Sequence, residues 1–100
     1  MTAPQEIVSR ATFKEVLDRT AQKTAALRAA VPDWPILDQI DAQLDFMRDC
    51  FDAGRTPTDD EKKSITLGPL AVRNIEDGNP EYADWLKELA YAFRRLEALP

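Results

Sequence analysis

Five aspartates recur at helical spacing within one segment of the chain. They are Asp38, Asp41, Asp45, Asp49 and Asp52, and intervals of three and four residues place them on one face of an α-helix. Carboxylates that share a helix face can bind a divalent metal ion, attract a basic partner or pair with cations of a neighbouring helix. This aspartate stripe disfavours its own helix, because aspartate is a poor helix former and like charges four residues apart repel. Something other than helix stability must explain it.

Three interpretations of the aspartate stripe are open at the level of the residues. In the first, it is a solvated face that cations of the preceding segment partly neutralise, namely Arg10, Lys14, Arg19, Lys23 and Arg28. In the second, Asp38, Asp41 and Asp45 form part of a divalent-metal site, loosely resembling the paired carboxylates of all-helical nucleotide pyrophosphohydrolases. The further acidic groups that such a site needs would be Asp59, Asp60 and Glu61. In the third, the stripe recognises a basic protein.

Groups for nucleophilic or acid–base catalysis are scarce in this sequence. The chain contains no histidine, so Ser9, Ser64 and the single cysteine, Cys50, have no imidazole to activate them. The three glycines do not form a phosphate-binding loop. We therefore expect a protein that is not an enzyme and that has no cofactor and no metal ion of its own. Cys50 is expected to be a small, partly buried side chain that forms no internal disulfide.

Charge and length limit the partners and the location. The 100-residue chain carries a formal net charge of −5, which disfavours nucleic acid and anionic membrane surfaces and favours a basic partner. No apolar run is long enough to span a bilayer, and the first residues lack the pattern of a secretory signal. We expect one helical domain, spanning residues 1–100, in the cytoplasm.

Hydrophobic periodicity predicts an all-α fold, a bundle of about four amphipathic helices without a strand. The first helix is expected over about residues 4–30, with Thr2 as its N-cap. The second is expected over about residues 36–53, where apolar positions follow a clean three-four rhythm. The last begins at Asn79-Pro80, an N-cap followed by proline at the first helical position. Short connections between such helices are typical of a helical bundle.

The third helical segment contains an interruption. Thr58 and Glu61 form a T-D-D-E capping box that predicts its start. Gly68-Pro69 lies in its middle, and a proline in a helix removes one backbone donor and crowds the carbonyl four residues back. We expect the third helix to be kinked or broken at Gly68-Pro69, with a second short piece that ends near Glu76.

Trp34 is a further candidate for partner binding. It stands between Pro32 and Pro35, in the segment that ends the first helix. Packing is the ordinary explanation for Trp34, as it is for Trp85, but an exposed tryptophan beside two prolines can anchor an interface. Trp34 therefore joins the aspartate stripe as a candidate partner-binding residue.

The segment SITLGPLAVRNIEDGNPEYADWLKELAYAF resembles a family of small bacterial immunity proteins. The resemblance rests on Thr66-Leu67-Gly68, Leu70-Ala71-Val72-Arg73, an acidic turn at Glu76-Asp77 and the helix start Asn79-Pro80-Glu81. Upstream, IDAQLDFMRDCF fits the helix that precedes this phrase in the family. The resemblance covers about residues 36–93, and the sequence departs from it at Pro69, where an ordinary helix former is expected.

These immunity proteins protect against a type VI secretion effector whose toxin domain hydrolyses NAD and NADP. The resemblance implies a small, all-helical cytoplasmic protein that binds the cognate toxin domain tightly and occludes its active site. It supplies no toxin-contact residues, so the aspartate stripe and Trp34 are chosen from charge and geometry. A toxin that binds a dinucleotide phosphate, or another nucleotide, presents cationic groups that the stripe can engage. The alternatives are a helical adaptor module or a divalent-metal nucleotide pyrophosphohydrolase.

Overall fold

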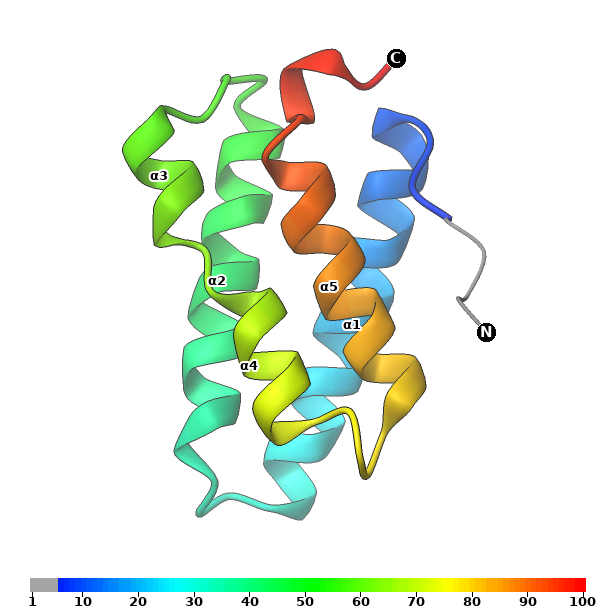
Figure 1. The fold of residues 1–100 in the computed structure, drawn as a ribbon, viewed down its shortest axis with the longest axis vertical. Helices are drawn as coiled ribbons and strands as arrows, with labels where there is room; N and C mark the ends of the chain where they lie inside the picture. The colour runs from blue at the N-terminus through cyan, green and yellow to red at the C-terminus, as the bar shows by residue number, and fades with distance from the viewer. Residues whose placement is uncertain (1–5) are drawn as a thin grey trace.

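Antiparallel helices joined by short turns make up the fold of residues 6–100, the part of the chain that the computed structural model describes. Their order is α1 (Arg10–Ala30), α2 (Pro35–Asp52), α3 (Asp59–Ser64), α4 (Leu67–Asn74), α5 (Pro80–Phe93) and a final 3₁₀ turn, η1 (Leu96–Ala98). α3 and α4 follow one another along one leg of a four-legged bundle (Figure 1). No residue in that range lies in a strand, and none of its helices is long and apolar enough to cross a membrane. The predicted all-α bundle is confirmed.

α1 begins later than the periodicity predicted. Thr2 and Pro4, on which the predicted start rested, lie outside the described residues. The helix begins at Arg10 because Ser9 and Thr12 form a reciprocal capping box. The Ser9 hydroxyl accepts from the Thr12 N–H (3.2 Å), and the Thr12 hydroxyl oxygen accepts from the Ser9 N–H (2.9 Å). The prediction of a helix from about residue 4 was wrong, because this cap satisfies the first backbone donors at a later position.

α2 and α5 begin where the sequence predicted, each with a proline at its first position. Pro35 opens α2 and Pro80 opens α5, and the missing N–H of proline is not needed there. The Asn79 side chain caps α5 by accepting from the Tyr82 N–H (3.4 Å). Gly54 follows α2 with a φ of +65°, a left-handed conformation that glycine adopts without strain. The starts of both helices and the end of α2 therefore lie at local signals that can be read in the sequence.

The third leg is divided into two pieces, as predicted, but the predicted position of the break at Gly68-Pro69 was wrong. The turn that joins the pieces lies at Ile65 and Thr66. Gly68-Pro69 then falls in the first turn of α4, where a backbone N–H has no intrahelical partner to lose. The side chain of Gln43 on α2 bridges the turn. Its Oε1 accepts from the Thr66 N–H and its Nε2 donates to the Thr66 hydroxyl, both at 2.8 Å. A contact from another helix thus fixes where the third leg turns.

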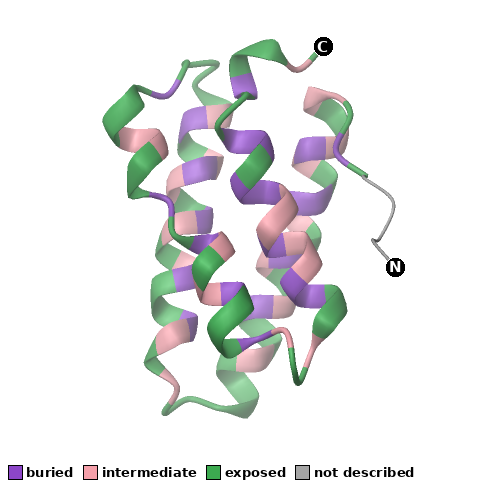
Figure 2. Ribbon diagram, viewed as in Figure 1, coloured by how far each residue is buried: buried purple, intermediate pink, exposed green. Residues whose placement is uncertain are grey.

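The core lies between the four legs and is continuous from one end of the bundle to the other (Figure 2). α1 packs against α2 and α5, and α4 packs against the same two helices, while α3 buries no residue. Thr20 and Thr24 interrupt the apolar stripe of α1 and are nevertheless fully buried. Each hydroxyl donates to the carbonyl four residues back, Thr20 to Val16 (2.7 Å) and Thr24 to Thr20 (2.8 Å). Their polar groups are therefore satisfied inside the core.

Candidate functional site

The aspartate stripe runs along α2 on the side next to α1. Near the end of α1, Arg28 pairs with both Asp38 (2.8 Å) and Asp41 (3.0 Å). Near the start of α1, Lys14 pairs with Asp52 (3.4 Å). The antiparallel turn between the two helices brings Arg28 opposite the first aspartates and Lys14 opposite the last. These pairs lie at the surface, where each stabilises the fold by about 0–1 kcal/mol.

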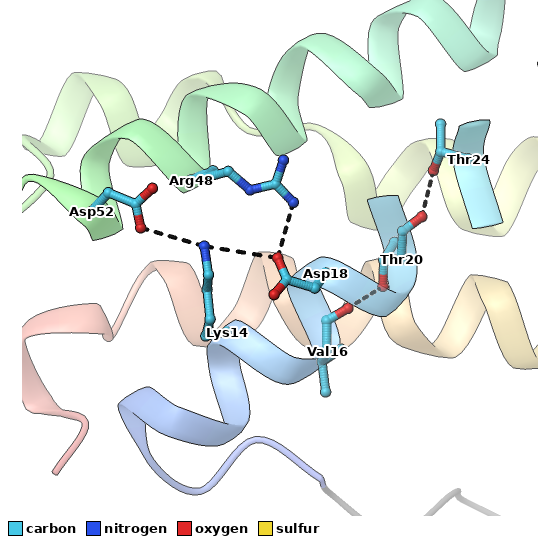
Figure 3. A network of polar contacts seen from close by, with 7 residues as sticks. All are labelled: Lys14, Val16, Asp18, Thr20, Thr24, Arg48 and Asp52. Atoms are coloured by element: carbon cyan, nitrogen blue, oxygen red, sulfur yellow. Dashed lines mark hydrogen bonds and ion pairs between the residues drawn. The ribbon is translucent and has the colours of Figure 1, made fainter. Parts of the chain in front are cut away.

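A cross-helix network continues the pairing of α1 with α2 (Figure 3). Asp18 on α1 accepts from Arg48 on α2 at 3.1 Å. The ammonium group of Lys14 lies 3.8 Å from Asp18 and 3.4 Å from Asp52, so opposite charges alternate across the seam between the helices. Because its members are partly exposed, this network contributes little to the stability of the fold. Through Lys14, the network pairs Asp52, the last member of the aspartate stripe, with α1.

Asp45 and Asp49 differ from the other members of the aspartate stripe. Both are exposed, and neither forms an ion pair with any residue from 6 to 100. At 100° per residue Asp41 and Asp52 lie nearest the buried side of α2, Asp49 lies furthest from it, and Asp38 and Asp45 lie between them. The carboxylates of Asp45 and Asp49 are the part of the stripe that the described fold leaves available to a partner.

Only some of the cations that were expected to neutralise the aspartate stripe pair with it among residues 6–100. Arg10 lies 4.9 Å from the centre of the Phe51 ring. Arg19 pairs with Glu6 (2.7 Å) and lies 5.2 Å from the Trp85 ring. Within residues 6–100, the cations of α1 that reach the stripe are Lys14 and Arg28. The pairing with α1 cations that the solvated-face interpretation expects is therefore present at three of the five aspartates, which are Asp38, Asp41 and Asp52.

The two aspartates at the centre of the metal-site interpretation are paired with an arginine. Asp38 and Asp41 share the guanidinium of Arg28. The acidic residues that were to complete the site occupy the first turn of α3, and they are Asp59, Asp60 and Glu61. Among residues 6–100 no three acidic or cysteine side chains are grouped so that they could hold a metal ion.

Glu61 is engaged in holding the start of α3. Its carboxylate accepts from the Arg55 guanidinium (2.6 and 2.9 Å) and from the Thr58 N–H (2.8 Å). The Thr58 hydroxyl accepts in turn from the Glu61 N–H, which completes the predicted capping box. The hydrogen bonds from Arg55, and after them the one from Thr58, lower the pKa of Glu61 to about 2. Glu61 therefore acts as a structural anion of the turn before α3.

Cys50 lies in the core as a small side chain. It is 1% exposed, and its thiol donates to the Arg55 carbonyl at 3.2 Å. Burial raises the pKa of the thiol above its ordinary value, which disfavours the reactive thiolate. The expected structural role of Cys50 is in keeping with this placement.

Trp34 lies at the end of the bundle where two connections meet. It is half-buried against the core cluster, as the N-cap of α2. A hollow of about 240 Å³ opens beside it, and the residues that line it are Leu27, Trp34, Asn74, Ile75, Gly78, Asn79 and Tyr82. Sequence reasoning singled out only Trp34 from this set. The hollow could have been inferred from the up-and-down order of the helices, because this order brings residues 31–34 and 75–79 to the same end of the bundle (Figure 1).

Comparison with known proteins identifies the family. The family model Tsi6 matches residues 9–95, which include α1 to α5, the aspartate stripe and the hollow beside Trp34. The match extends the resemblance seen in residues 36–93 to the first helix. Comparisons with curated proteins and with solved structures gave no match. The chain therefore belongs to the Tsi6 family of type VI secretion immunity proteins.

Proposed function

We propose that this protein is a cytoplasmic immunity protein that binds the toxin domain of its cognate type VI effector and occludes the active site of that domain. The observation that carries the proposal is the family match over residues 9–95, which spans nearly all of the described fold. The scarcity of catalytic groups supports a role in binding, since the chain has no histidine and its only cysteine is buried. In this role the protein protects the cell that produces the toxin and has no reaction of its own.

We further propose that the toxin is an NAD(P)⁺ glycohydrolase or another nucleotide-targeting enzyme. An enzyme that binds a dinucleotide must place cationic or hydrogen-bond-donating groups around the phosphates. An inhibitor with a net charge of −5 complements such a cleft in sign. Charge complementarity of this kind raises the association rate and selects against wrong partners. Fast association matters for a protein that must capture a toxin before it acts.

The aspartate stripe is the surface we propose for this contact, with Asp45 and Asp49 at its centre. α2 has 18 residues and is therefore about 27 Å long. Its apolar face is buried in the core, and pairs with Arg28 and Lys14 link its two ends to α1. A rigid charged helix loses little conformational entropy on binding. The paired aspartates remain partly exposed and can contribute from the flanks.

Co-purification tests the proposal. The toxin domain encoded beside the gene for this protein is expressed together with the tagged chain, and the complex is isolated and assayed for NAD(P)⁺ hydrolysis. We expect a one-to-one complex without hydrolytic activity, and activity that returns when the partners are separated. Absence of a complex would contradict the immunity function. A complex whose separated toxin leaves NAD(P)⁺ intact would contradict only the proposed toxin chemistry.

A further inference from the structure

The hollow beside Trp34 has the size and lining of a site for a single side chain. Its volume of about 240 Å³ is below the range of roughly 300–1,000 Å³ typical of small-molecule sites. Leu27, Trp34, Ile75 and Tyr82 give it a largely apolar wall. An elongated side chain with an apolar stem therefore suits it better than a metabolite.

Polar groups at the hollow favour a donor at the tip of that side chain. The amide nitrogen of Asn74 donates to the Leu70 carbonyl at 3.2 Å, and no residue from 6 to 100 donates to its Oδ1. The oxygen of the Asn79 amide is already used in capping α5. Asn74 thus contributes an acceptor, and an aromatic face with an acceptor nearby suits a cationic group.

The rim of the hollow carries negative charge. Asp33, Asp77 and Glu81 are exposed neighbours of the lining residues in sequence, and none forms an ion pair within residues 6–100. Two arginines, Arg28 and Arg73, are also direct neighbours of lining residues in the sequence. Arg28 is engaged by Asp38 and Asp41, as described above.

Arg73 offsets at most one of these three charges. It is exposed and lies about 160° around α4 from the buried Ala71, at 100° per residue. It therefore projects away from the core side of α4, on which Ile75 lines the hollow. Lys23 also stands one turn before Leu27 on α1, so the charges near the hollow are three carboxylates against two cations, and the remaining negative charge favours a cation.

We propose that the hollow is a socket for one arginine or lysine side chain of the toxin domain. The aliphatic stem packs against Leu27 and Trp34, and the charged group lies over the indole and bonds to the Asn74 oxygen. The rim carboxylates draw the cation in. Trp34 stands four residues before Asp38, so the socket lies near the first end of the aspartate stripe and one toxin domain can contact both. This inference rests on the proposed function, because the toxin supplies the occupant.

A pair of tryptophan variants tests the socket. The affinity of the toxin domain encoded by the neighbouring gene is measured by calorimetry for the parent, Trp34→Leu and Trp34→Phe. Trp34→Leu keeps an apolar wall but removes the aromatic face, and we expect it to weaken binding about tenfold or more. Trp34→Phe should weaken binding less. The control is Trp85→Leu, because Trp85 is also half-buried but its ring is already covered by Arg19, and binding should change by less than about threefold.

A second variant tests the charge of the occupant and does not touch the core. In Asp77→Asn/Glu81→Gln the rim loses two exposed charges, so we expect the fold to persist and binding to weaken severalfold, most strongly at low salt. Parent affinity for Trp34→Leu would overturn the socket. Weakened binding in Trp34→Leu, together with parent affinity for the rim variant at every salt concentration, would show an apolar occupant and would also overturn it.

A double-mutant cycle then identifies the side chain that enters. Each arginine and lysine of the toxin domain is replaced by alanine and tested against the parent and against Trp34→Leu. One of these replacements should weaken binding to the parent and add nothing further in Trp34→Leu. If none behaves in this way, the socket assignment is wrong. If the parent itself does not bind the toxin domain, the proposed function fails, and this inference fails with it.

Discussion

The hydroxyl groups of Thr24 and Tyr82 meet 2.6 Å apart between α1 and α5, with both side chains almost fully buried. Thr24 gives its only proton to the Thr20 carbonyl, so Tyr82 must be the donor in the contact between the two hydroxyls. Burial raises the pKa of Tyr82 above its ordinary value, so the phenol remains a donor at neutral pH. A threonine thus occupies a core position because it supplies the acceptor that a buried tyrosine requires.

Replacing Thr24 with valine should therefore destabilise the protein by about 1–3 kcal/mol, because it leaves the Tyr82 hydroxyl buried without an acceptor. Urea unfolding measures the change in the free energy of unfolding. Thr20→Val is the matched control, since the Thr20 hydroxyl bonds only to the Val16 carbonyl of its own helix, and it should cost less than about 1 kcal/mol. Equal losses in the two variants would show that the contact between Thr24 and Tyr82 contributes nothing special.

Glu61 gives the start of α3 a dependence on pH. Its pKa in the folded protein is lowered to about 2, so the folded state binds its proton more weakly than the unfolded state. The stabilisation is therefore complete above about pH 4.5 and is lost as the pH falls toward 2. Glu61→Gln should melt below the parent at pH 6, and the difference between their melting temperatures should shrink as the pH approaches 2. A constant difference would contradict this role of the Glu61 charge.

At the scale of helices, local signals predicted some boundaries and tertiary contacts decided others. The start of α5 could be read from Asn79-Pro80, and the apolar rhythm placed the start of α2 within one residue of its observed position at Pro35. The start of α1 could not, since an early threonine and proline imitate a cap, while Ser9 and Thr12 satisfy the backbone later in the chain. The Gly68-Pro69 pair predicted that the third helix is interrupted, but the turn between α3 and α4 lies at Ile65 and Thr66. Its location depends on Gln43, which lies in a different helix.

Pro69→Ala tests how α4 begins. If Pro69 kinked a continuous helix, alanine would restore a hydrogen bond and stabilise the protein. In the first turn of α4 there is no bond to restore, and the freer unfolded chain should make Pro69→Ala neutral to about 1 kcal/mol less stable. Gly68→Ala is the contrasting variant, because a Cβ there meets nothing within 4 Å, and it should stabilise by about 0.4–1 kcal/mol. Stabilisation by both variants in thermal melts would indicate a strained helix.

At the scale of the whole molecule, the sequence predicted which face is charged but not which of its aspartates are ion-paired. The spacing of the five aspartates shows that they share a face of α2, and that placement requires only helical geometry. Which of them are engaged depends on Arg28 and Lys14 reaching across from α1, which only the packed bundle defines. The hollow beside Trp34 is likewise created by two connections that are distant in sequence. The partner-binding surface proposed from the sequence therefore narrows to Asp45 and Asp49, with the socket at its end.

The double variant Asp45→Lys/Asp49→Lys tests whether this surface binds the toxin domain. Neither residue is ion-paired within residues 6–100, so both can be reversed without breaking a contact, whereas reversal at Asp41 would disrupt its pair with Arg28. Its control is Glu15→Lys/Asp60→Lys, two exposed residues outside α2 that also lack an ion pair in that range. Each double variant changes the formal net charge by the same amount, two units per substitution. A difference between them therefore reports on position and not on total charge.

Survival of cells that express the cognate toxin domain is the most direct measurement. The parent, Asp45→Lys/Asp49→Lys and Glu15→Lys/Asp60→Lys are produced at matched levels beside the toxin, and growth is recorded. We expect growth with the parent and with the control, and death with Asp45→Lys/Asp49→Lys although that variant accumulates normally, because reversed charge slows capture of a basic partner. Full protection by Asp45→Lys/Asp49→Lys would contradict the aspartate stripe as the neutralising surface, and death with the parent would contradict immunity itself.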